Sequence, residues 1–226
     1  MVRTFSKSKR DKNMPLFSRE FNQAMSFVRQ TLEYEKNNAD KIVILDYIMK
    51  LVKEDIKSDL LSTVIYQPWG FEKRINIPFP LCYEDELGNQ YTLEPKANAE
   101  KEVDLKTDCV LVLAWDRERM RNSIKNIFYN PFRYHDTNHL ACYFEYIDLC
   151  YAHNGTHSIS AGLVHRKGTI VAPNVYDVRE LFEHIYTDGL NWYNQHNKEK
   201  LSPLFDFRVG VLFEISKLKY ELEQMR

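Results

Sequence analysis

The stretch NGTHS, residues 154–158, combines residue types that bind anionic groups. It lies between an apolar run that predicts a strand and a segment that predicts a helix. Gly155 permits a positive φ or a close backbone approach, and the first amides of the following helix have no partner within that helix. Because the positive end of the helix dipole lies behind those amides, the turn favours a phosphate or a carboxylate.

The side chains of the turn add hydrogen-bond donors. Asn154, Thr156 and Ser158 supply an amide and two hydroxyls, and His157 can transfer a proton near neutral pH. The alternative is a well-capped helix start in which Asn154 or Thr156 is the cap and His157 packs. Asn-Gly before a helix is common, so both interpretations stay open at this point.

A histidine cluster around the turn invites a metal hypothesis. Five of the seven histidines lie between residues 135 and 165, and Asp136 lies among them. Asp116 and Asp136 are the carboxylates that could hold Mg²⁺ beside a phosphorylated ligand. The spacing matches neither H-E-x-x-H nor a Cys/His zinc pattern. A metal-dependent nuclease is therefore a variant hypothesis.

The segment AWDRERMRN places Arg117, Arg119 and Arg121 at the start of a predicted helix. Cations at this end oppose the helix dipole, so they indicate an anionic ligand or acidic neighbours. A solvated helix face is the alternative.

Periodicity predicts the elements that position these residues. Helices are expected from Ser18, with Ser18 as N-cap, and over 39–57. Strands are expected at 109–115, 141–152 and 169–178, and a last strand-like stretch at 204–213. Helices are expected at 117–128, with Ile124 and Phe128 inward, at 156–168, over 177–186 and at the C-terminus. This alternation predicts an α+β protein whose mixed-sheet core lies at 108–226.

The remaining residues form two other segments. Residues 1–65 are predicted to hold a basic arm and a helical hairpin, and residues 66–107 an irregular insertion with a β-hairpin turning at Gly88-Asn89. The arm is an alternative phosphate contact. Its basic residues are Arg3, Lys7, Lys9, Arg10 and Lys12.

Composition excludes several classes of protein. Apolar residues make up 44% and charged residues 28%, as in soluble globular proteins. The net charge of -1 gives no global attraction to nucleic acid or to a membrane. The cysteines form no C-x-x-C pair, and no apolar run approaches the ~20 residues of a membrane helix. We expect a cytoplasmic protein without a membrane partner.

Several of these residues also resemble a known superfold. The segment NGTHSISAGL after a strand is similar to the second motif of the ParB/sulfiredoxin-like fold, and LAWDRERM resembles its first motif. The whole run resembles an uncharacterised bacterial family of this superfold. The matched residues are Trp115, Arg119, Asn138, His139, Asn154, Gly155, His157, Ser158, Gly162, Asp188 and Gly189.

The resemblance implies a site that binds a nucleotide or another phosphorylated ligand. His157, His139 and Arg119 would be its catalytic residues, and Asn154, Gly155, Thr156, Ser158 and Asn138 its binding residues. Thr156 stands where sulfiredoxin has its catalytic cysteine, which argues against sulfinic-acid reduction. The expected function is phosphate binding with phosphohydrolase or phosphotransferase activity, and Mg²⁺ is the expected cofactor. The alternative is a catalytically degenerate module that binds DNA or a protein.

Overall fold

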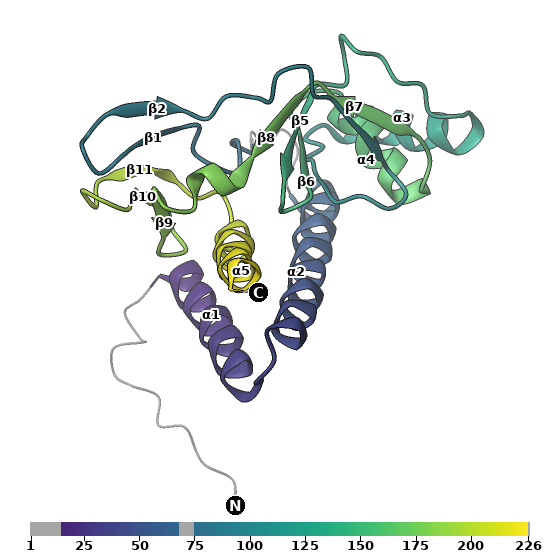
Figure 1. Cartoon of the computed structure of the whole chain (residues 1–226). Helices are drawn as coiled ribbons and strands as arrows, with labels where there is room; N and C mark the ends of the chain where they lie inside the picture. Colours follow the sequence, from purple (N-terminus) through teal and green to yellow (C-terminus); the bar gives the residue numbers. More distant parts are fainter. Residues whose placement is uncertain (1–14, 68–74, 226) are drawn as a thin grey trace, which may run out of the picture.

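The computed structural model describes residues 15–67 and 75–225. The chain is a mixed α+β protein in which three helices lie beneath two groups of strands (Figure 1). The α+β class is therefore confirmed. The basic residues of the predicted arm lie outside the described residues.

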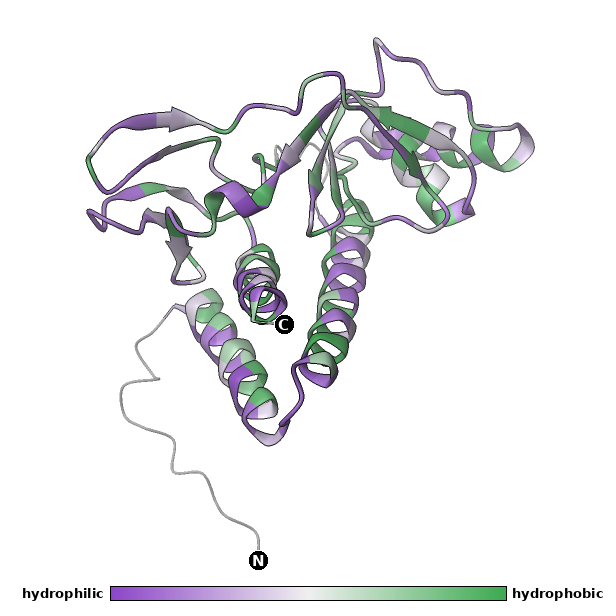
Figure 2. Cartoon of the chain, in the orientation of Figure 1, coloured by the Kyte–Doolittle hydropathy of each residue, from purple (hydrophilic) through white to green (hydrophobic). Residues whose placement is uncertain are grey.

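Three long helices form the lower half of the molecule. They are α1 (Leu16–Tyr34), α2 (Asn38–Tyr66) and α5 (Phe207–Gln224). The predicted helical hairpin exists as two consecutive helices, but α1 and α2 diverge, and α5 packs against both (Figure 1). Figure 2 shows polar and apolar residues alternating along these helices, as expected for helices that bury one side.

The start of α1 differs from the prediction. Pro15 is the N-cap residue, and Ser18 lies inside the first turn, where its hydroxyl donates to the Asp188 carbonyl at 3.0 Å. Proline is favoured at a helix start because it has no N–H to satisfy. Ser18 is thus a tertiary contact and not a cap.

A four-stranded mixed sheet forms the centre of the upper half of the molecule (Figure 1). Its order is β4 (Val110–Leu111), β6 (Leu149–Ala152), β5 (Ala141–Glu145) and β8 (Asn174–Asp177). β4 is parallel to β6, β5 is antiparallel to β6, and β5 is parallel to β8.

Both faces of this sheet are covered, which explains its continuous apolar strands. Leu111, Tyr151 and Phe144 face the cluster formed with the three long helices. Val110 and Cys150 face a second cluster. That cluster also contains residues of α4 (Thr156–His165) and of the β3 (Lys101–Asp104) and β7 (Thr169–Ala172) pair.

Helix α3 (Arg117–Tyr129) lies beside α4 at the outer end of this sheet (Figure 1). Asp116 caps it as predicted, because its carboxylate accepts the Arg119 N–H at 2.7 Å. Met120 and Ile127 are buried. The prediction that Ile124 and Phe128 point inward is wrong, since they are 43% and 58% exposed. Met120 and Ile127 face the interior, and much of the rest of the helix is exposed to solvent.

The predicted hairpin in the insertion is confirmed. β1 (Cys82–Glu84) pairs antiparallel with β2 (Gln90–Thr92). Gly88 has a φ of +81° in the turn, and the Asp85 carboxylate accepts the backbone N–H groups of Leu87 and Asn89, each at 2.9 Å.

Two predicted strands are in fact strand pairs. Residues 141–152 form the β5–β6 hairpin, because Tyr146 and Asp148 adopt φ of 69° and 53° and reverse the chain. Residues 169–178 divide into β7 and β8, which pair with different strands. The β5–β6 turn contains no glycine or proline, so the apolar run concealed it, whereas Pro173 separates β7 from β8.

The C-terminal third differs most from the prediction. The expected helix at 177–186 is a short 3₁₀ turn, η2 (Val178–Leu181), followed by β9 (Ile185–Thr187). β9, β10 (Asn191–Asn194) and β11 (Lys200–Pro203) form a small sheet. The strand-like stretch at 204–213 mostly belongs to α5, whose first half is buried on nearly all sides and so lacks a helical apolar period.

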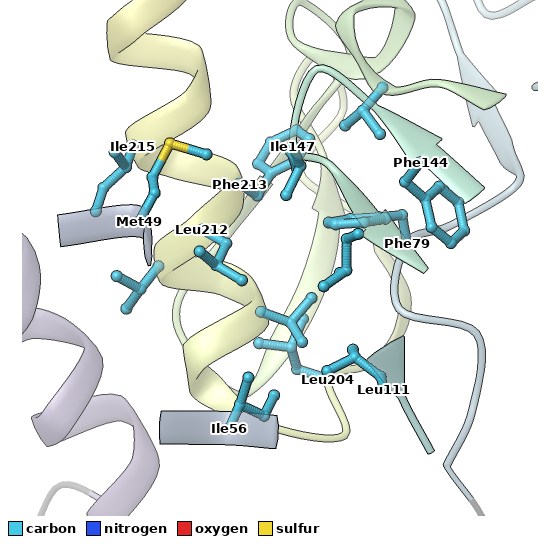
Figure 3. Close-up of a cluster of buried hydrophobic side chains, with 14 of the residues drawn as sticks. Met49, Ile56, Phe79, Leu111, Phe144, Ile147, Leu204, Leu212, Phe213 and Ile215 are labelled. Carbon is cyan, nitrogen blue, oxygen red and sulfur yellow. The ribbon is translucent and has the colours of Figure 1, made fainter. Parts of the chain in front are cut away.

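The main hydrophobic core joins all three predicted segments. Figure 3 shows Met49 and Ile56 of α2, Phe79 of the insertion, and Leu212 and Phe213 of α5 in one cluster. The segments 1–65, 66–107 and 108–226 therefore share one core.

Candidate functional site

A polar cavity of about 400 Å³ lies at the N-terminus of α4. It forms where the β4–α3 junction, the loop before β5 and the β6–α4 turn meet. We call it the NGTHS pocket. Its lining residues are Trp115, Arg119, Asn122, Ser123, Asn138, Asn154, Gly155, Thr156, His157 and Ser158. None of these described residues is acidic. The pocket therefore combines one guanidinium group with several uncharged hydrogen-bond donors.

Gly155 is required at the turn for two independent reasons. Its φ is +69°, in the left-handed region that favours glycine. A Cβ at this position would also overlap the His139 ring and approach the Asn138 carbonyl oxygen to 2.9 Å. The turn therefore packs directly against the loop that precedes β5.

His139 fastens this turn from behind. It is only 2% exposed, and its Nδ1 accepts the His135 backbone N–H at 2.9 Å. Nε2 must then carry the ring hydrogen, and it lies 2.9 Å from Ser158 Oγ, which donates to the Gly155 carbonyl at 2.9 Å. Burial lowers the pKa of His139, and the neighbouring His135 lowers it further. The ring is thus a neutral bridge across the turn.

His157 is half-buried and lies at the edge of the pocket. Its Nε2 accepts the Asp116 backbone N–H at 3.1 Å. Burial lowers its pKa, an effect that Asp116 partly opposes and Arg119 reinforces. While this hydrogen bond persists, Nε2 has no lone pair with which to remove a proton from a ligand.

Arg119 and Trp115 line the pocket next to His157. The guanidinium carbon lies 5.3 Å from the Trp115 ring centroid, and the His157 ring meets the same indole edge-on at 5.5 Å. Trp115 is 45% exposed. The strand-to-helix junction therefore presents a cation and an aromatic face to the cavity.

The other two arginines of the cluster have separate roles. Arg117 donates from Nε to the Val64 carbonyl at 3.0 Å and from Nη2 to the carbonyls of Ile65, at 3.0 Å, and Gln67. It thereby caps the C-terminus of α2, which explains a cation at the start of α3. Arg121 is exposed, in agreement with a solvated face.

The proposed Mg²⁺ ligands do not gather at the pocket. The Asp116 carboxylate is engaged as the α3 cap, and this hydrogen bond is the main reason that its pKa is lowered. Asp136 accepts the Thr137 N–H at 2.8 Å within its own turn. Neither residue lines the NGTHS pocket.

The histidine cluster is likewise dispersed. His153 is exposed and packs beside the Tyr151 ring, and His165 packs beside Phe128. Within residues 15–67 and 75–225, no group of three or more His, Cys, Asp or Glu side chains could hold a metal ion. The donor set that the nuclease variant requires is not formed.

The cysteines take no part in the site. Cys109, Cys142 and Cys150 are buried. Burial raises the pKa of Cys109 and of Cys142 to about 12 and also raises that of Cys150. Cys150 is therefore an inert core thiol, as its apolar strand predicted.

A second cavity adjoins the first and was not predicted. We call it the Asn130 pocket; its volume is about 380 Å³. Its lining residues are Asn126, Ile127, Asn130, Pro131, Phe132, Arg133, His135, Asn138, His139 and Ser158. The available signal was the spacing of Asn122, Asn126 and Asn130, which recur every four residues along α3 and its C-cap.

Two larger cavities suit an anion less well. One of about 580 Å³ is lined by three glutamates, among them Glu180 and Glu183. The other, of about 490 Å³, mixes four lysines with four carboxylates. The carboxylates in each would repel an anionic ligand, so the NGTHS pocket is the stronger candidate.

The fold and the site together define a mixed α+β protein with a carboxylate-free, cationic pocket at a helix N-terminus. The chain belongs to the family described as "Family of unknown function (DUF6710)", whose model matches residues 3–226. Comparisons with curated proteins and with solved structures gave no match. In the part of the chain that the structure describes, no helix is long and apolar enough to cross a membrane.

Proposed function

We propose that this chain binds a nucleotide or another small phosphorylated ligand in the NGTHS pocket. One observation carries the proposal: the Arg119 guanidinium and the first turn of α4 face the same cavity, and none of the residues lining it is acidic. Arginine and helix N-termini are the two protein features that most often bind phosphate.

The first turn of α4 supports this assignment. Its N-cap is Gly155, which offers no side chain to the orphan amides, and no side-chain cap bond is formed there. The Ser158 hydroxyl bonds the Gly155 carbonyl instead. The N–H groups at Thr156 and His157 are thus placed to donate to a ligand oxygen.

The order of elements supports a ParB/sulfiredoxin-like core. Strand β6, the NGTHS turn and α4 follow one another, and β4 leads into α3 in the same mixed sheet. This is the arrangement that the sequence resemblance implies for residues 105–195.

The hydrogen bonds of the two histidines favour binding over acid–base catalysis. His139 uses both ring nitrogens inside the protein, and His157 Nε2 accepts from Asp116. We therefore assign His139 to positioning the turn and His157 to the pocket wall. A phosphohydrolase would have to break the Asp116 bond before Nε2 could take a proton.

Ligand binding to Arg119→Gln provides the test. Isothermal titration with ATP, CTP, GTP and pyrophosphate, each with and without Mg²⁺, should show binding of at least one ligand to the wild type. Loss of one charge-assisted hydrogen bond should weaken that binding about 10- to 100-fold. A ligand present at 100 times its Kd should also raise stability by about 2.7 kcal/mol in a thermal-shift assay.

Arg121→Gln is the matched control, because Arg121 is exposed on the same helix and lines neither cavity. Its affinity should equal that of the wild type. Ser123→Asp, which places a carboxylate in the NGTHS pocket, should abolish binding. If Arg119→Gln binds as tightly as Arg121→Gln, the ligand does not occupy this pocket.

A further inference from the structure

The NGTHS pocket and the Asn130 pocket are neighbouring cavities. Both are lined by Asn138 and Ser158, so the two cavities meet at these residues. We call the combined surface the α3 groove, because residues of α3 line it along much of that helix. Its two cavities measure about 400 and 380 Å³.

One stripe of α3 faces the groove from end to end. Asn122 lines the first cavity, and Asn126 and Asn130 line the second. Residues four apart share a helix face, and Asn122 and Asn130 are separated by about 12 Å along the axis. Asn130 is the C-cap residue of α3. Asn122 and Asn126 lie inside the helix, where asparagine is a poor residue, so these two indicate a role other than helix formation.

The asparagines retain unused hydrogen-bonding groups. Asn130 Nδ2 donates to the Asn126 backbone carbonyl at 3.1 Å and to Asn126 Oδ1 at 3.0 Å. In the described part of the chain, these bonds leave Asn126 Nδ2 and Asn130 Oδ1 for other partners. A donor and an acceptor side by side suit the edge of a base.

The groove has a cation at each end and no carboxylate among its described lining residues. Arg119 lies in the first cavity and Arg133 in the second. The segment 117–133 contains five arginines or lysines and one glutamate. This local charge contrasts with the net charge of -1 for the whole chain. Of these five, Arg119 and Arg133 line the groove, and Arg117, Arg121 and Lys125 do not.

Aromatic rings accompany the cations. Trp115, 45% exposed, lies in the first cavity, and Phe132 lies half-buried in the second. Charged grooves with aromatic platforms bind single-stranded nucleic acids, because phosphates pair with the cations and bases stack on the rings.

We infer that the α3 groove binds a segment of single-stranded nucleic acid, of which the ligand in the NGTHS pocket is one nucleotide. This inference rests on the proposed function for its first cavity. Stacked nucleotides rise about 3.4 Å each. The stripe is about 12 Å long, so it accommodates about three of them. A mononucleotide would leave Arg133 and the Asn130 pocket without a role.

Fluorescence anisotropy with labelled oligothymidylates of one, two, three and six nucleotides tests the inference. Affinity should rise at least tenfold between the mononucleotide and the trinucleotide and then level off. Arg133→Gln should weaken trinucleotide binding about tenfold and leave mononucleotide binding unchanged. Loss of one phosphate contact should also reduce the slope of log Kd against log salt by about 0.7.

The controls separate this inference from the proposed function. Lys125→Gln, exposed on α3 and outside both cavities, should bind as the wild type. Equal affinity for one and three nucleotides, with no effect of Arg133→Gln, would overturn the groove and leave the NGTHS pocket as a mononucleotide site. Equally tight binding of a duplex or of tripolyphosphate would overturn the single-strand assignment. Failure of every ligand would overturn both proposals.

Discussion

Glu214 is a carboxylate held inside the protein, on α5 against β9. Its Oε1 is buried and has no hydrogen-bond partner among the described residues. Burial raises the pKa of this carboxyl above its usual value near 4.5. The charge of Lys217 opposes this rise, as do a backbone hydrogen bond from Thr187 and the charge of Arg29. Its charged form is therefore a source of instability in the folded state.

Glu214→Gln should change the pH dependence of stability in a defined direction. Because the folded pKa is raised, the folded state binds more protons than the unfolded state between the two pKa values, and stability falls as pH rises through that window. The variant loses this dependence. Its free energy of unfolding relative to the wild type should increase by on the order of 1 kcal/mol between pH 4 and pH 8.

Urea denaturation across this pH range measures the effect. Glu33→Gln, exposed on α1 and not among the groups that shift the Glu214 pKa, should show no comparable trend. A difference between Glu214→Gln and the wild type that stays constant with pH would show that Glu214 is ionised at its usual pKa.

At the scale of elements, Arg117 joins the end of one helix to the start of another. Helix α2 has no basic residue in its own last turn, and Arg117 at the start of α3 supplies the cation to its terminal carbonyls. The same turn of α3 carries Arg119 into the NGTHS pocket. The cap therefore orients a binding residue as well as ending a helix.

Arg117→Met should lower the free energy of unfolding by about 1–3 kcal/mol, because charge-assisted bonds to the terminal carbonyls of α2 are lost. Guanidinium denaturation followed by circular dichroism measures this. Arg121→Met on the same helix should change stability by less than about 0.5 kcal/mol. Similar losses in both variants would mean that helix propensity and not the cap is responsible.

At the scale of the whole molecule, one core joins the helices to both groups of strands. Phe79 is completely buried, and its ring centroid lies 4.9 Å from that of Phe144, 5.8 Å from Trp192 and 6.0 Å from Phe213. These partners belong to β5, β10 and α5. The insertion is therefore a structural part of the protein and not a detachable lid.

Phe79→Ala should lower the free energy of unfolding by about 3–5 kcal/mol, because it leaves a cavity at this junction. The far-UV signal and tryptophan fluorescence should report the same transition, since Trp192 and the helices share the core. Leu87→Ala, at a position 80% exposed in the hairpin turn, is the matched control. Two separate transitions would show that the strands at 82–92 and 185–203 unfold independently of the helices.

The sequence by itself determined the local features whose signals lie within a few residues. The Asp116 cap, the Gly88 turn and the left-handed glycine at the start of α4 were all predictable, because each depends on the chemistry of a single turn. The residue types of the NGTHS turn and of Arg119 predicted a polar site, and a polar cavity lies at these residues.

Only the tertiary structure decided where these parts meet. The turn at Tyr146 and the helical state of residues 207–213 were concealed, because segments buried on both faces lose the periodicity that distinguishes strand from helix. His139 lies behind the turn rather than in the NGTHS pocket, since its ring bonds the His135 backbone N–H and the Ser158 hydroxyl. The bond from Asp116 to His157 joins residues 41 positions apart, and such long-range contacts follow from packing rather than from local sequence.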